Sequence, residues 1–170
     1  MDKNEFIHYF LPAAEAAGEA YQINPDIILA QAAVESGWGE SKLALNHFNF
    51  FGITGYGRPS AHWTGTRVDI RAGKSGDKPG LMFRSYPRHQ ASFLDFARLI
   101  RQVYPRAAAV SFDPKAYAKE IAYSPYISEV NGDNREAYQR LIASVCRSIV
   151  RVRKLMALPN SLQSPALALG

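Results

Sequence analysis

The sequence lacks most of the features by which metal sites, disulfide frameworks and membrane spans are recognised. Its 170 residues include one cysteine, Cys146, which excludes an intramolecular disulfide framework and a cysteine-rich zinc site. No segment approaches the roughly 18 consecutive apolar residues of a transmembrane helix, and the first residues lack the unbroken apolar run of a signal peptide. The four histidines show no metal-ligand spacing, and neither a phosphate-binding glycine-rich motif nor a GxSxG nucleophile motif occurs. We therefore expect no metal, no cofactor and no transmembrane segment.

What the chain does contain is the composition of one globular domain with a basic surface. Hydrophobic residues make up 47% and aromatic residues 12% of the chain, which is enough for one core and argues against disorder. Lysine and arginine outnumber aspartate and glutamate by 20 to 15, and such a surface suits nucleic acid, anionic lipid or an anionic polysaccharide. The basic residues are spread along the chain, and their one dense run, residues 147–154, is typical of a solvated helix face. We therefore expect no nucleic-acid partner.

The N-terminal third and the C-terminal half place apolar side chains at helical spacing. Asn24 and Asp113 each precede a proline, a pair typical of an N-cap and a first helical residue, so we predict that helices begin there. A last helix is predicted over 134–157, with Tyr138, Leu141 and Cys146 on its core side. In that position we interpret Cys146 as a buried, inert thiol rather than as a nucleophile.

The middle of the chain, about residues 51–86, is rich in glycine and contains two extended segments. Alternation over 62–71 and the segment 81–86 predict two strands that pair across a polar turn at residues 73–80. The result is an α+β fold, mostly helical with a small β-hairpin lobe. We expect a single domain over residues 1–158, followed by a loose tail at 159–170.

Among the carboxylates, Glu35 has the most unusual sequence context. It follows an uncharged, largely apolar stretch, residues 27–34, and precedes a glycine-rich turn that contains Trp38. The C-terminal end of a helix, apolar neighbours and a nearby indole all disfavour the anion and raise the pKa of a carboxyl group, as a general acid requires. An exposed, idle glutamate at a helix end is equally compatible with the pattern, so these arguments alone leave both interpretations open.

Two motifs around Glu35 carry a resemblance to a known family. The string AQAAVESGWG occupies residues 30–39, and NFFGI follows at residues 49–53. Further matches lie in chain order at residues 83–86, 92–97, 104–106 and 122–125. Over roughly residues 20–150 the chain resembles the flagellar-type glucosaminidases of glycoside hydrolase family 73, although ESGWG-like strings also occur in other lysozyme-fold hydrolases. The resemblance implies a lysozyme-like fold and hydrolysis of peptidoglycan.

Carried over position by position, the resemblance implies a set of site residues. Glu35 matches the catalytic acid of the family, and Tyr123 matches a tyrosine near the scissile sugar. Trp38, Asn49 and Phe51 match residues that shape the cleft beside the acid. Under the same hypothesis, the aromatic side chains expected to form walls on which sugar rings stack are Trp38, Phe51, Tyr123 and Tyr126.

The second carboxylate of the family has no clear counterpart in this chain. Family members carry a glutamate in the β lobe, and the register puts Lys74 near that position. Asp69 and Asp77 are the remaining candidates. Asp69 lies between Arg67 and Arg71, whose charges are expected to lower its pKa and keep it ionised for a role as base or charge stabiliser. A plain surface ion pair explains the same pattern, and a mechanism that uses the N-acetyl group of the substrate needs neither aspartate.

The leading hypothesis is a β-N-acetylglucosaminidase that cuts the glycan strands of peptidoglycan, with Glu35 as general acid. A muramidase or lytic transglycosylase of the same fold is the first alternative, and a transglycosylase would not need the missing second carboxylate. A non-catalytic module that binds cell wall or nucleic acid is the second alternative.

The expected place of action follows from the substrate. Peptidoglycan lies in the periplasm or cell wall, yet no signal peptide is visible, which suits a dedicated secretion system or a part of a larger assembly. An antibacterial effector delivered in this way would imply a cognate inhibitor that occludes the cleft, because the producing cell must survive its own enzyme.

Overall fold

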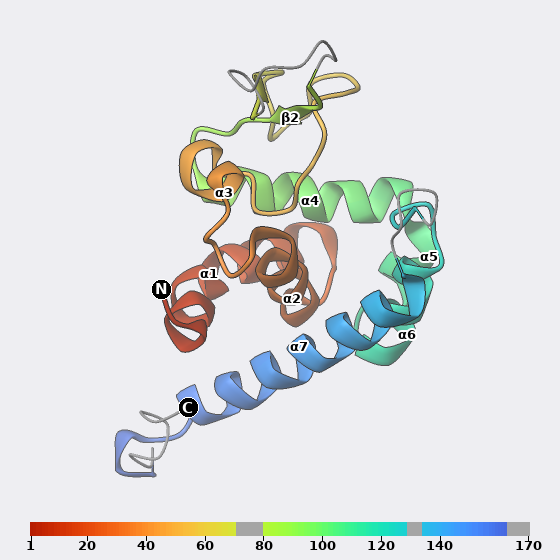
Figure 1. Cartoon of the computed structure of the whole chain (residues 1–170). Helices are drawn as coiled ribbons and strands as arrows, with labels where there is room; N and C mark the ends of the chain where they lie inside the picture. Colours follow the sequence, from red (N-terminus) through yellow and green to blue (C-terminus); the bar gives the residue numbers. More distant parts are fainter. Residues whose placement is uncertain (71–79, 129–133, 163–170) are drawn as a thin grey trace.

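The computed structural model describes residues 1–70, 80–128 and 134–162, which form a group of packed helices with a small two-stranded lobe (Figure 1). The elements in chain order are α1 (Lys3–Tyr21), α2 (Pro25–Ser36), α3 (Lys42–His47), β1 (Arg67–Asp69), β2 (Met82–Arg84), α4 (His89–Val103), α5 (Pro105–Ala109), α6 (Pro114–Ala122), α7 (Arg135–Met156) and the 3₁₀ turn η2 (Asn160–Leu162). The predicted α+β fold is confirmed. In the described ranges, none of the helices has both the length and the apolar character needed to cross a membrane.

The helix starts follow from local capping. The side chains of Asn24, Asp113 and Asn134 each accept a hydrogen bond from a backbone N–H in the first turn of α2, α6 and α7. Pro25 and Pro114 occupy first helical positions, where the missing N–H costs nothing. The helix starts predicted from the asparagine–proline and aspartate–proline pairs are therefore confirmed. The tail predicted from residue 159 includes η2, and its residues 163–170 lie outside the described residues.

Helix α2 is the centre of the core. It packs against α1 on one side and α7 on another, and α1 also packs against α4 (Figure 1). Every side chain from Ile27 to Ala33 is fully buried. This explains why residues 27–34 carry no charge, because a helix covered on several faces has no solvated side on which to place one.

Helix α2 ends in a tight turn that sets the position of Glu35. The Ser36 hydroxyl donates to the backbone oxygen of Ala32 and accepts from the Gly39 N–H at 2.8 Å. Gly37 follows in the left-handed conformation, with φ of +57°, which glycine adopts without the steric cost of a side chain. Glu35 therefore lies in the last turn of α2, directly before the residues that end the helix.

The β lobe is smaller than predicted. β1 and β2 pair antiparallel over three residues each, with Val68 opposite Phe83. The strands predicted over 62–71 and 81–86 were therefore too long within the described residues, and the predicted turn at 73–80 lies outside them except for its last residue. The reason is Trp63, which is buried. Its indole N–H donates to the backbone oxygen of Thr66 at 2.8 Å, so the chain folds around the ring instead of extending.

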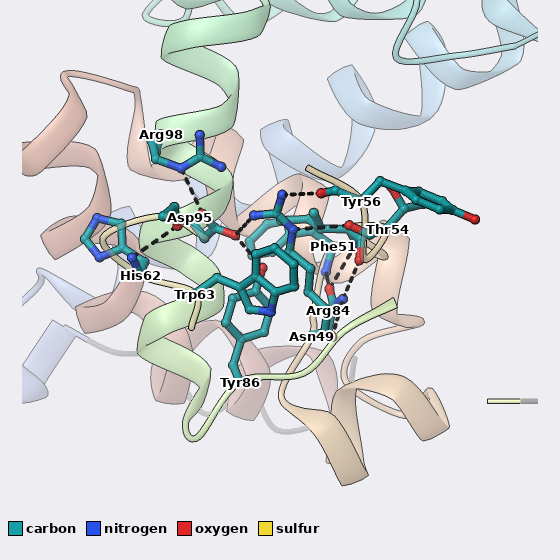
Figure 2. Close-up of polar contacts among 12 residues, drawn as sticks. Asn49, Phe51, Thr54, Tyr56, His62, Trp63, Arg84, Tyr86, Asp95 and Arg98 are labelled. Atoms are coloured by element: carbon teal, nitrogen blue, oxygen red, sulfur yellow. Dashed lines mark hydrogen bonds and ion pairs between the residues drawn. The ribbon is translucent and has the colours of Figure 1, made fainter. Parts of the chain in front are cut away.

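A buried carboxylate ties this lobe to α4 (Figure 2). Asp95 is fully buried and accepts hydrogen bonds from Arg84 at 2.7 Å, Tyr86 at 2.6 Å, Ser60 at 2.7 Å and Arg98 at 2.8 Å. Burial alone would raise the pKa of Asp95. Hydrogen bonds from Tyr86, Ser60 and Arg98 outweigh it and hold that pKa below its ordinary value. The sequence offered no sign of this anchor.

Arg84 connects the buried Asp95 to the loop that precedes β1. Its Nε and Nη2 atoms donate to the backbone oxygens of Thr54 at 3.2 Å and Tyr56 at 3.0 Å, and its guanidinium lies 4.0 Å from the centre of the Trp63 ring (Figure 2). One arginine therefore joins a helix, a strand and a loop. This junction holds the loop at Thr54 and Tyr56 to β2 and α4.

The predicted core side of the last helix is confirmed with one correction. Ile142, Cys146 and Ile149 are buried, and burial raises the pKa of Cys146 to about 12, as expected of an inert thiol. Leu141, which was predicted to face the core, is 46% exposed. Because α7 rests on α2 and α6 along only part of its circumference, Leu141 falls at the margin of that contact.

Candidate active site

Glu35 is half-buried at the wall of a cavity of about 810 Å³, which we call the Glu35 cavity. The described residues that line it are Glu35, Phe51, Gly52, Ile53, Thr54, Tyr56, Arg84, Leu99, Tyr104, Pro125, Tyr126, Ile127, Asn134, Ala137, Tyr138 and Leu141. They come from the end of α2, the loop before β1, strand β2, the end of α4 and the residue after it, the connection that follows α6, and the first turns of α7. The cavity therefore lies between the β lobe and the helices.

Two phenols meet the Glu35 carboxylate. The Tyr138 hydroxyl donates to Oε1 of Glu35 at 2.7 Å, and the Tyr126 hydroxyl approaches the same oxygen at 3.5 Å. The Tyr126 ring packs edge-on against Tyr104, with ring centres 5.6 Å apart. These aromatic rings form one wall of the cavity and hold a carboxyl group at its surface.

A second layer of polar side chains lies behind Tyr138. Gln31 donates from Nε2 to the Tyr138 hydroxyl at 3.2 Å, and its Oε1 accepts from the Tyr117 hydroxyl. Gln31 and Tyr117 are fully buried. Burial first, and then the charge of Glu35, hold the pKa of Tyr117, Tyr126 and Tyr138 well above the ordinary value of a phenol. All three phenols therefore stay protonated near neutral pH.

The charges around the cavity are few. Among the described residues that line it, Glu35 is the only carboxylate and Arg84 the only cation, and Arg84 is engaged by Asp95. The described residues contain no group of three or more histidine, cysteine, aspartate or glutamate side chains that could hold a metal ion. The chemistry that this arrangement supports is proton transfer by one carboxyl group beside aromatic surfaces.

Of the predicted cleft residues, Phe51 and Tyr126 line the Glu35 cavity. Phe51 is stacked on Phe96, with ring centres 4.0 Å apart and planes 5° apart. Asn49 is 1% exposed and is not among the lining residues. Its amide donates to the backbone oxygens of Ile53 and Arg84, and its Oδ1 accepts from backbone N–H groups of the same loop. Asn49 therefore shapes the loop that presents Phe51.

Trp38 is not brought to the Glu35 cavity. Gly37 and Trp38 both have positive φ, and these two left-handed residues turn the chain back toward α1. The Trp38 ring packs edge-on against Phe6 at 5.4 Å and has the Lys3 ammonium 5.2 Å from its centre. It lines a separate hollow of about 300 Å³ together with Tyr9 and others.

Tyr123 lies in a hollow next to the Glu35 cavity. It is 59% exposed and lines a space of about 550 Å³ with Arg106 and Lys119. This hollow and the Glu35 cavity share Tyr104 and Pro125 as lining residues. The structure therefore does not bring Tyr123 to the carboxyl group of Glu35.

Asp69 lies on β1, opposite Met82, and is half-buried outside the lining of the Glu35 cavity. Asp77, Lys74 and Arg71 lie outside the described residues. The expected ion environment of Asp69 therefore stays a prediction.

Sequence reasoning missed Tyr138, Gln31 and Tyr117. Tyr138 was assigned only to the core side of its helix, although it reaches Glu35. Gln31 did leave a signal, because it is the single side chain with hydrogen-bonding groups between residues 27 and 34 and lies one helical turn before Glu35. Tyr117 left none, because its partners come from distant parts of the chain.

Comparison with known proteins places these features in a family. The family model Glucosaminidase, described as mannosyl-glycoprotein endo-beta-N-acetylglucosaminidase, matches residues 11–150. Peptidoglycan hydrolase FlgJ of Vibrio parahaemolyticus serotype O3:K6 is 30% identical over 134 residues, which cover 73% of this chain and 42% of that protein. The chain spans less than half the length of the first curated relatives that it matches.

Solved structures have the same fold. The crystal structure of a peptidoglycan hydrolase from Sphingomonas sp. A1 superposes with a TM-score of 0.66 at 25% identity, over 92% of this chain and 96% of that chain. A type VI secretion system effector-immunity complex from Pseudomonas protegens contains a chain with a TM-score of 0.62 at 18% identity, over 91% of this chain and 94% of that chain. The predicted lysozyme-like fold is confirmed. Because the family match covers most of the chain and includes Glu35 and the tyrosines around it, the chain belongs to the glucosaminidase family.

Proposed function

We propose that this protein is a peptidoglycan glycoside hydrolase, a β-N-acetylglucosaminidase that cuts the glycan strand after N-acetylglucosamine with Glu35 as general acid. The observation that carries the proposal is the carboxyl group of Glu35 at the wall of an 810 Å³ cavity, with hydrogen bonds from two phenols to one of its oxygens. Family membership and relatives that are peptidoglycan hydrolases support the choice of substrate.

Cleavage of a glycosidic bond needs a proton on the leaving oxygen as an oxocarbenium-like transition state develops. Tyr138 and Tyr126 both approach Oε1 of Glu35, so the transferable proton belongs on Oε2. Once Glu35 has given up this proton, the hydrogen bond from Tyr138 becomes charge-assisted and stronger. The phenols therefore stabilise the product form of the acid.

The aromatic lining suits a sugar polymer. Phe51 and Tyr126 offer apolar faces within the cavity, and Tyr104 continues that wall toward the hollow of Tyr123. We assign Phe51 and Tyr126 to sugar contacts beside Glu35 and Tyr123 to a sugar contact farther along the strand. Asn49 acts through the loop that carries Phe51, and a substrate contact of Trp38 would require glycan to reach the separate hollow next to α1.

A second carboxylate is the open element of the mechanism. Asp69 is the described candidate of the β lobe, and it lies outside the lining of the Glu35 cavity. The N-acetyl group of the substrate is the alternative nucleophile. The presence of one carboxylate among the described lining residues also favours a second candidate function, a lytic transglycosylase, in which an internal hydroxyl of the sugar replaces water.

Digestion of purified peptidoglycan tests the proposal. Mass spectrometry of the products is expected to find reducing N-acetylglucosamine ends. Reducing N-acetylmuramic acid ends would instead identify a muramidase, and anhydro sugars a lytic transglycosylase. Binding to peptidoglycan without any cleavage, in wild type and in Glu35→Gln alike, would contradict the enzymatic proposal and favour a binding module.

We further propose that the protein acts in the periplasm or cell wall and that a protein inhibitor can occlude the Glu35 cavity. The substrate lies outside the cytoplasmic membrane, and a fold relative is a secretion effector in complex with its immunity protein. When the protein is exported to the periplasm of an expressing cell, co-expression of a gene adjacent to its own is expected to protect that cell from lysis. Equal lysis with and without each neighbouring gene would contradict the inhibitor.

A further inference from the structure

A directional chain of hydrogen bonds leads from the core to Glu35. Tyr117 donates to Oε1 of Gln31, Nε2 of Gln31 donates to the Tyr138 oxygen at 3.2 Å, and Tyr138 donates to Oε1 of Glu35 at 2.7 Å. Gln31 and Tyr117 are fully buried and do not line the Glu35 cavity. The described hydrogen bonds therefore connect them to Glu35 through Tyr138.

We propose that Gln31 and Tyr117 are positioning residues that point the Tyr138 O–H bond at Oε1 of Glu35 and thereby reserve the other oxygen for the transferable proton. We call Tyr117, Gln31 and Tyr138 together the Tyr138 relay. The inference rests on the proposed role of Glu35 as general acid.

The direction of the relay follows from the chemistry of its groups. A glutamine amide has one end that accepts and one end that donates, whereas a phenol has a single proton to donate. Because Tyr117 donates to the oxygen of the Gln31 amide, the NH₂ group of Gln31 faces Tyr138. The Tyr138 oxygen accepts that hydrogen bond, so its own proton is left for Glu35. Each bond thus fixes the direction of the next.

Burial keeps the hydrogen bonds of the Tyr138 relay in this donor-to-acceptor direction. The raised pKa values of Tyr117 and Tyr138 keep both phenols protonated, so neither reverses its role by losing a proton near neutral pH. In the dry core a polar group that loses its partner is costly, which disfavours a flip of the Gln31 amide. Gln31 and Glu35 are four residues apart on α2 and share a face, so the helix also holds these two side chains at a set distance from each other.

Direct titration of the Glu35 carboxyl carbon by NMR, in the full chain and without substrate, tests the relay. A hydrogen bond donated to a carboxylate favours its ionised form. Tyr138→Phe is therefore expected to move the Glu35 midpoint upward by about one to two pH units. Gln31→Met is expected to move it less in the same direction, and Tyr117→Phe least. The Glu35 signal is assigned from its loss in Glu35→Gln.

Tyr21→Phe is the matched control, because it removes a tyrosine hydroxyl that bonds His62 at 2.6 Å, away from the Glu35 cavity. It is expected to leave the Glu35 midpoint unchanged. In kinetics, Gln31→Met is expected to lower kcat by about tenfold with little change in KM, and Tyr21→Phe to change neither.

A double-mutant cycle separates the relay from simple packing. If Gln31 acts through Tyr138, adding Gln31→Met to Tyr138→Phe moves the Glu35 midpoint no further. The relay would be overturned if Gln31→Met shifted the Glu35 midpoint equally in the wild-type and the Tyr138→Phe backgrounds. It would also be overturned if Gln31→Met and Tyr117→Phe both kept the wild-type midpoint of Glu35. These titrations need no substrate, so they report on the relay even if the wild-type protein proves unable to cleave peptidoglycan, which would contradict the proposed function instead.

Discussion

Two carboxylates of this protein, Asp95 and Glu35, each accept hydrogen bonds from tyrosine but have different surroundings. Asp95 is fully buried and is contacted by two guanidinium groups, from Arg84 and Arg98, as well as by a phenol and a hydroxyl. Glu35 is half-buried at the wall of a large cavity, and the hydrogen bonds described for it come from the phenol of Tyr138 and, at longer range, another phenol.

The difference shows how environment assigns a role to a carboxyl group. Positive charges and several donors around Asp95 favour its ionised form, which suits a permanent anchor between the β lobe and α4. Neutral phenols support an ionised Glu35 after proton transfer and still allow its protonated form before it. The comparison therefore sets a structural carboxylate, Asp95, against the carboxylate that we propose as general acid, Glu35. Each of the following variants tests one side of this comparison.

The largest effect on activity is expected for Glu35→Gln. The amide keeps the shape of the side chain but cannot deliver a proton, so cleavage of labelled peptidoglycan should fall by about 10²–10⁴-fold or more. The thermal midpoint should stay close to that of wild type. Wild-type turnover in the purified variant would remove Glu35 from the mechanism, and a large loss of stability would assign it to the structure.

Asp95→Asn is expected to have the opposite profile. It leaves the buried Arg84 and the partly buried Arg98 without their counter-charge, so the free energy of unfolding should fall by about 3–5 kcal/mol in urea titrations. Glu136→Gln is the matched control, because it breaks an exposed ion pair with Arg140 at 2.6 Å and should cost no more than about 1 kcal/mol. Equal stability of the two variants would contradict the anchor.

Asp95 is also expected to make the stability of the protein depend on pH. The folded-state pKa of Asp95 is lowered from the reference value of 3.8, so its contribution to stability is fully present above that value and is lost as the pH falls through the folded pKa. Urea unfolding of the wild type between pH 6 and pH 2 should therefore show a stability loss that is shallower in Asp95→Asn. Parallel curves for the two proteins would exclude Asp95 as the source.

Tyr126→Phe is expected to have a small effect. Its hydroxyl lies 3.5 Å from Glu35, against 2.7 Å for that of Tyr138, and long hydrogen bonds are weak. The variant should lower kcat by about twofold to fivefold, less than Tyr138→Phe does. Steady-state kinetics on soluble glycan fragments measures the ranking. The reverse order would mean that substrate draws Tyr126 closer to Glu35.

The smallest effects are expected for the two aspartate variants of the β lobe, Asp69→Asn and Asp77→Asn. Because Asp69 lies on β1 outside the lining of the Glu35 cavity, the change should alter the cleavage rate by no more than about twofold. Asp77→Asn should have still less effect, and neither should approach Glu35→Gln. A loss as large as that of Glu35→Gln in either variant would identify the missing base and exclude substrate assistance.

The parts of the fold that could be predicted depend on neighbours in the sequence. The start of α2 at Pro25 and its stop at Gly37 were readable because a cap and a left-handed glycine act within one turn of helix. The strands came out shorter than expected because burial of Trp63 against Arg84, 21 positions farther along the chain, overrides local alternation. Leu141 was also misplaced because of tertiary packing, since the neighbouring helices cover only part of the surface of α7.

The amino-acid sequence by itself determined the helix boundaries, the uncharged segment before Glu35 and the family motif around it, because capping, turn geometry and helical periodicity act over a few residues. Only the tertiary structure decided which groups meet that carboxyl group. Tyr126 and Tyr138 reach Glu35 across 91 and 103 positions of sequence, whereas Trp38, three positions away, turns toward α1. Proximity at the site is set by how the helices pack, and the spacing of residues along the chain does not encode that packing.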